Sequence, residues 1–187
     1  MIVSLGQLWI PIVAAAVGIF IASSLVHMVF KWHNADYRKL ANEDDVRAVV
    51  RASSPAPGQY VIPYCSDMKL MQTPEFQQKF KDGPVAFLTV RPSGPPTIGP
   101  ALGQWFVLNL VVALLVAYLA SKSLPSTASF LQVCRIVGTV TFMAYAGGSI
   151  SGAIWMGKPW ASAAKEVLDA FIYGLVSAVI FGWLWPR

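Results

Sequence analysis

Four long apolar stretches are the feature that most constrains the fold of this chain. Residues 8–30, 102–120 and 136–156 contain no Asp, Glu, Lys or Arg, and residues 167–185 contain only Asp169. An α-helix needs about 20 mainly apolar residues to cross the hydrocarbon layer of a bilayer, which is roughly 30 Å thick. The sequence therefore predicts four membrane-spanning helices.

The composition supports this class of protein. Of the 187 residues, 56% are hydrophobic and 12% are charged, whereas soluble domains contain roughly 25% charged residues. The net charge of +5 would suggest a nucleic-acid ligand in a soluble protein. Here the basic residues flank the apolar stretches, where membrane orientation and anionic lipid explain them. We expect a lipid bilayer as the partner and no nucleic acid.

The predicted fold is an all-α membrane protein, a four-transmembrane-helix bundle with a small α+β cytoplasmic insert between helices 1 and 2. The predicted segments are helix 1 at 8–30, the insert at 31–101 with a Pro- and Gly-rich linker at 91–100, and helices at 102–120, 131–156 and 161–185.

Local signals define the elements of the insert. Asn42 is followed by three acidic residues and Thr73 by a proline, and both patterns are typical of helix starts. Apolar, partly β-branched runs indicate strands. The insert is predicted to contain helices at 43–52 and 74–82 and strands at 60–62 and 85–90.

Charges close to the spans predict the orientation, because cytoplasmic loops carry an excess of Lys and Arg. One side carries Lys31, Arg38, Lys39, Arg47, Arg91, Lys158 and Lys165, and the other carries Lys122, Arg135 and Arg187. We therefore expect a multi-pass protein of the inner (plasma) membrane with both termini outside and residues 31–101 in the cytoplasm.

Small residues recur every fourth position in the last two apolar stretches. Residues four apart share a helix face, and in lipid such columns allow close approach of helix backbones. The two helices are predicted to pack as a hairpin along these columns. The column residues are Ala144, Gly148 and Gly152 on the first helix and Ala170, Gly174, Ala178 and Gly182 on the second.

Asp169 is the most informative ionisable residue, because an acid within a span is costly and marks a functional site by default. Lys165 lies one helical turn earlier and could reach it. Two interpretations stay open. In the functional one, Asp169 belongs to a proton or ion relay or contacts a polar ligand headgroup. In the structural one, it belongs to a set of hydrogen bonds between helices. The predicted polar cluster comprises Asp169, Lys165, Ser149, Tyr145, Tyr173 and Asn109.

Other reactive side chains form no recognisable motif. His27 and His33 are predicted to lie at the inner interface, as a possible ligand or interface site together with Arg135 at the outer interface. A haem held by two histidines needs them on facing helices, and zinc needs three or four ligands. We predict no metal, no cofactor, and free thiols at Cys65 and Cys134.

The sequence shows no catalytic constellation, so an enzyme is not the expectation. The first functional hypothesis is a structural, assembly or accessory subunit of a larger membrane complex, with a protein partner or further copies of the chain. An alternative is a small transporter or channel that uses the polar cluster around Asp169. A second alternative is a membrane enzyme or redox subunit that uses His27 and His33.

Overall fold

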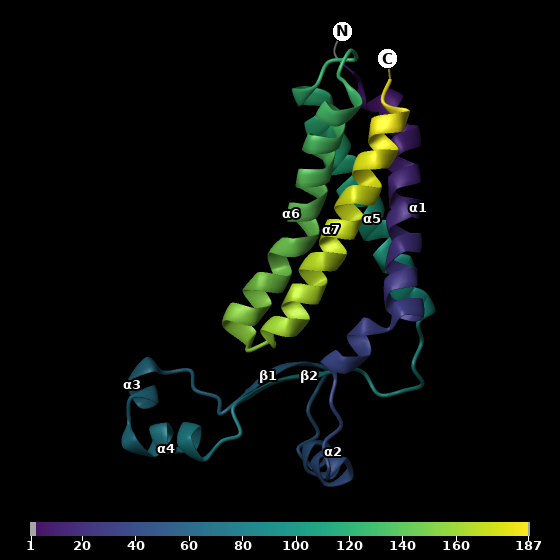
Figure 1. Cartoon of the computed structure of the whole chain (residues 1–187). Helices are drawn as coiled ribbons and strands as arrows, with labels where there is room; N and C mark the ends of the chain where they lie inside the picture. The colour runs from purple at the N-terminus through teal and green to yellow at the C-terminus, as the bar shows by residue number, and fades with distance from the viewer. Residues whose placement is uncertain (1–2, 187) are drawn as a thin grey trace. The chain divides into compact units, whose positions relative to one another are not determined.

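The computed structural model describes residues 3–186, and most of them are helical. Four long helices dominate (Figure 1). The first combines η1 (Leu5–Leu8), α1 (Trp9–Ser24) and the π-helical turn η2 (Leu25–Phe30); the others are α5 (Gly99–Ser123), α6 (Phe130–Met156) and α7 (Trp160–Leu184). The shorter elements are η3 (Trp32–Asp36), α2 (Glu43–Ala52), β1 (Gly58–Ile62), α3 (Met68–Met71), α4 (Pro74–Asp82) and β2 (Ala86–Val90).

The four predicted apolar helices are present. They contain 26, 25, 27 and 25 residues and are long and apolar enough to cross a membrane. One boundary differs from the prediction, because α5 begins at Gly99, inside the predicted linker at 91–100. Pro100 lies in the first turn of α5, where its missing N–H has no helical partner to lose.

Residues 39–96 form a compact unit of their own, described here by itself. Strands β1 and β2 pair in antiparallel fashion, with Gly58 opposite Val90 and Ile62 opposite Ala86. The predicted helices and strands of this unit are all present. The Thr73 hydroxyl accepts a hydrogen bond from the backbone N–H of Phe76 at the start of α4.

The other unit contains the four long helices together with the chain up to Arg38. The prediction that the insert begins at residue 31 is therefore wrong, because residues 31–38 belong to the helical unit. Within that unit α6 and α7 lie side by side, and α1 packs on α7 and α5 (Figure 1). An apolar core fills the end of the bundle where α1 begins, and its members include Leu8, Ala15, Val116, Ala120, Val133, Val137, Phe181 and Trp185.

A glycine contact sets the close approach of α6 and α7. A Cβ atom added at Gly174 would lie 3.0 Å from the backbone oxygen of Gly138 and 3.4 Å from Cβ of Phe142. Such distances leave no room for a larger side chain. The predicted column on α7 lies at this interface, and all of its members are buried: Ala170, Gly174, Ala178 and Gly182.

The predicted column on α6 is wrong. Ala144 and Gly148 are exposed, and a Cβ at Gly148 would meet no atom within 4 Å, while Gly152 is half-buried. At this end of the bundle α6 instead buries another side of the helix, through Ala146, Ser149 and Ala153. Spacing identifies a shared helix face but not the neighbour that the face meets.

The glycine contact generates a prediction about stability. Replacing Gly174→Leu should lower the free energy of unfolding by about 1–3 kcal/mol, because an extra side chain in a packed interface forces the helices apart. Gly148→Leu is the matched control, since it gains the same helix propensity at a position with open space. Unfolding of both variants in detergent measures the difference, and equal stabilities would contradict the packing described.

Candidate functional site

A buried carboxylate on α7, that of Asp169, is the centre of the polar site. The residue is only 4% exposed, within a helix that is apolar enough to span a membrane. Ionisable groups at such positions are costly unless they pair with polar groups. Asp169 Oδ2 lies 2.8 Å from His33 Nε2, whereas Oδ1 has no hydrogen-bond partner among residues 3–186. One carboxylate oxygen is therefore satisfied and the other is free.

The chain folds back after the first helix and thereby brings η3 to α7. Lys31 adopts a left-handed conformation, with φ 54° and ψ 19°, which ends the helix and redirects the chain. The Lys165 ammonium then holds η3 in place. It donates hydrogen bonds to the Trp32 carbonyl at 2.8 Å and to Asp36 Oδ1 at 2.6 Å. A charged side chain of α7 thus anchors η3 one helical turn before the buried carboxylate.

His33 is held between two carboxylates. Its Nδ1 lies 2.8 Å from Asp36 Oδ2, and its Nε2 lies 2.8 Å from Asp169 Oδ2. His27, on η2, stacks on it with ring centroids 4.6 Å apart and planes 9° apart. The Nε2 atom of His27 is 4.0 Å from Asp169 Oδ2. We call His27, His33 and Asp169 the histidine–aspartate cluster.

Asp36 remains ionised over the physiological pH range. The hydrogen bond from Lys165 is the largest influence on this carboxyl, and hydrogen bonds from His33 and Ser162 act in the same direction. Together they lower the pKa of Asp36 from its usual 3.8 to about 2. Asp36 is therefore a fixed negative charge that keeps His33 oriented.

The histidine–aspartate cluster can bind a proton or a metal cation. Its three donor atoms all lie within 4.8 Å of one another, which suits a proton shared between two groups or a metal ion. No sequence pattern joins these residues, because His33 and Asp169 are 136 positions apart. The local signals that point to them are two polar pairs at one-turn spacing, His33 with Asp36 and Lys165 with Asp169.

Part of the predicted polar cluster does come together. The Tyr145 hydroxyl donates to Asn109 Oδ1 at 2.8 Å, and the rings of Tyr145 and Tyr173 meet edge to face with centroids 5.3 Å apart. Tyr173 lies one helical turn after Asp169 on the same face of α7. Polar groups of α5, α6 and α7 therefore continue from the buried carboxylate into the bundle.

Two further members of the predicted cluster lie elsewhere. The prediction that Lys165 pairs with Asp169 is wrong, because Lys165 bonds to Asp36 instead. Ser149 is buried but makes no hydrogen bond to Asp169 within the described part of the chain. His33, rather than Lys165 or Ser149, contacts the Asp169 carboxylate.

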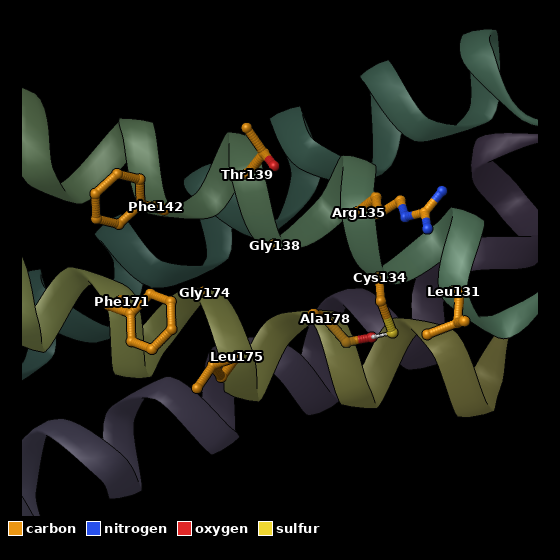
Figure 2. A pocket seen from close by; sticks show the side chains of 10 residues that line it. All are labelled: Leu131, Cys134, Arg135, Gly138, Thr139, Phe142, Phe171, Gly174, Leu175 and Ala178. Carbon is orange, nitrogen blue, oxygen red and sulfur yellow. Dashed lines mark hydrogen bonds between the residues drawn. The ribbon is translucent and has the colours of Figure 1, made fainter.

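An apolar groove lies between α6 and α7 (Figure 2), and its lining includes no member of the histidine–aspartate cluster. Its volume is about 540 Å³. Cys134 lines it and donates from Sγ to the Ala178 carbonyl at 3.2 Å, and Arg135 points away from α7. With Phe142 and Phe171 at its other end, the groove offers apolar contact rather than reactive groups.

The ion pair at η3 generates a prediction about titration. Lys165→Gln should raise the pKa of Asp36 from about 2 toward 3.8, because the largest stabilising influence on the carboxylate is lost. Carboxyl ¹³C resonances followed against pH in detergent measure the shift. Since the folded-state pKa is depressed, the pair stabilises the wild-type fold above about pH 3.8, and this contribution is lost as the pH falls through about 2. An unchanged pKa in the variant would contradict the assignment.

Comparison of the chain with models of protein families, with curated proteins and with solved structures finds no match.

Proposed function

We propose that the chain is a multi-pass protein of the inner (plasma) membrane, with both termini outside and residues 39–96 in the cytoplasm. The distribution of charge supports this orientation. The end of the bundle that carries η3 and the turn between α6 and α7 is rich in Lys and Arg, whereas Lys122 and Arg135 belong to the other end. An excess of basic residues is typical of the cytoplasmic side. The basic residues of the first end are Lys31, Arg38, Lys158 and Lys165.

Within that membrane we propose a structural or accessory role in a larger complex. A face of α6 carries the proposal: Ala144, Gly147, Gly148 and Ser151 are all exposed and are spaced three or four residues apart. We call this surface the small-residue face. A Cβ added at Gly147 or Gly148 would meet nothing within 4 Å, so no helix within residues 3–186 packs against these two positions.

Lipid-facing surfaces elsewhere in the chain look different. Along the middle of α5, at residues 107–119, the exposed positions are large and apolar, as at Leu114, Leu115 and Leu119. Acyl chains gain no special contact from glycine, whereas a second helix can approach its backbone closely. The small-residue face therefore suits a transmembrane helix of a partner protein or of another copy of this chain.

Crosslinking tests this role. A photo-crosslinking amino acid at Ser151 should form an adduct with a second polypeptide in native membranes, and the adduct's mass distinguishes another copy from a different protein. The same group at Leu115 is the matched control, because that position faces outward on another helix. Introducing Gly148→Leu beside the Ser151 probe should abolish the adduct, because the bulky side chain prevents close approach. An adduct that survives this change, or equal adducts from Leu115, would refute the role.

A second candidate function, a small transporter or proton path, is favoured by the line of polar groups. Asp169, Tyr173 and Ser177 are buried at four-residue spacing along α7. Asn109 Nδ2, Thr141 Oγ1 and Ser177 Oγ have no hydrogen-bond partner within the described residues. Buried polar groups without partners are costly, and water or a transported ion would satisfy them.

Flux measurements test this second function. Protein reconstituted in vesicles should move protons or a small cation, and Asp169→Asn should reduce the rate at least about tenfold if the carboxylate is an obligatory relay. Glu166→Gln is the matched control on the same helix, since Glu166 pairs with Lys158 rather than with the line of polar groups. A pH-sensitive dye inside the vesicles reports proton flux. Equal flux in Asp169→Asn and wild type would exclude the carboxylate from the path.

A further inference from the structure

Three donor atoms from separate elements converge on one point in the histidine–aspartate cluster. They are His27 Nε2 from η2, His33 Nε2 from η3 and Asp169 Oδ2 from α7. The separations from Asp169 Oδ2 are 4.0 Å for His27 and 2.8 Å for His33. Two imidazoles and a carboxylate form a ligand set that suits divalent first-row transition metals, including zinc and ferrous iron.

The hydrogen bonds behind the two rings fix the nitrogen that each presents. His27 Nδ1 lies 3.0 Å from the Ser23 carbonyl, and His33 Nδ1 lies 2.8 Å from the Asp36 carboxylate. Both partners only accept, so Nδ1 is the donor in each ring. The Nε2 atoms are then the ones that face Asp169, and at His33 a metal cation would replace the proton shared between Nε2 and Asp169 Oδ2. Metal-binding histidines are oriented in this way, by donation from the second nitrogen to a carbonyl or carboxylate.

Either a proton or a metal cation is needed where these atoms meet. Two Nε2 lone pairs and a carboxylate oxygen are all acceptors, and the nearest ammonium, that of Lys165, is bonded to Asp36 and Trp32. Asp169 is 4% exposed, and its Oδ1 has no hydrogen-bond partner among the described residues. A buried carboxylate with a free oxygen is costly, and a bound cation removes that cost.

We propose that His27, His33 and Asp169 bind a divalent transition-metal cation such as zinc, whether or not the chain has an accessory role. Zinc bonds to nitrogen and oxygen of about 2.0–2.2 Å place tetrahedral ligands about 3.3 Å apart. His27 thus moves inward and His33 outward by several tenths of an ångström. The His27 side chain is 52% exposed, so it has room to move by this amount.

Three protein ligands leave one coordination position open, as in zinc sites that bind a water or a substrate. A pocket of about 270 Å³ lies beside His27, and Ser23, Trp105 and Tyr173 also line it. It is otherwise apolar, with Met28 and Leu102 among its walls. The open position therefore faces a space large enough for water or a small organic ligand with an apolar part.

Metal titration of the full-length protein tests the site. The protein is purified in mild detergent with an affinity tag that contains no histidine, is stripped with a chelator, and is titrated with Co²⁺. One equivalent should produce the visible absorption of a four-coordinate cobalt site, and Zn²⁺ should displace it. An absence of saturable one-to-one binding would overturn the proposal and leave a proton shared by His33 and Asp169.

Matched variants separate this site from adventitious binding. His27→Gln and Asp169→Asn should each weaken Co²⁺ binding at least about tenfold, since even residues behind the ligands change affinity by 10–100-fold. Glu166→Gln should bind like the wild type. If Asp169→Asn fails to fold, His27→Gln still tests the site, because the His27 side chain is half exposed and its replacement should not disturb folding. Gel filtration and circular dichroism check the fold of His27→Gln. Equal affinity in His27→Gln and wild type would overturn the proposal.

Discussion

A carboxylate inside an apolar helix must find a compensating partner, and much of the helical unit follows from that requirement at Asp169. His33 supplies the partner, and it reaches α7 only because the chain reverses at Lys31 into η3. Asp36 then orients His33, and Lys165 neutralises Asp36. The four groups form a continuous chain of hydrogen bonds, so each depends on the next for its geometry.

Features that depend on local chemistry could be predicted from the sequence. The four long helices follow from uninterrupted apolar length, and α2, α4, β1 and β2 follow from caps, prolines and β-branched runs, whereas the short helix α3 was not predicted. The α7 column also follows from spacing, because Gly174 and Ala178 share a helix face whatever that face meets. In each case the information lies within about ten residues of sequence.

The identity of neighbours could not be predicted, because it depends on three-dimensional arrangement. Lys165 has Asp169 one turn away but bonds to Asp36, whose carboxylate reaches it from η3. Gly148 has the spacing of a packing residue, yet the neighbouring helices bury another side of α6. The His33–Asp169 contact joins residues 136 positions apart. No periodic pattern contains such a pairing, since periodicity describes one helix at a time.

The two halves of the helical unit are stabilised in different ways, and this difference gives the histidine–aspartate cluster its significance. Around Val137 and Phe181 the bundle has a dense apolar core, where even a Cβ at Gly182 would lie 2.6 Å from the Phe130 ring. The half that contains Asp169 has instead polar atoms without a hydrogen-bond partner among residues 3–186, such as Asp169 Oδ1 and Asn109 Nδ2, and open space at Gly148. Loosely packed regions open most easily and accommodate ligands. A cation bound by residues of η2, η3 and α7 would link these three elements through its coordination bonds. Because the free energy of metal binding adds to that of folding, these bonds would stabilise the half of the bundle that has fewer apolar contacts.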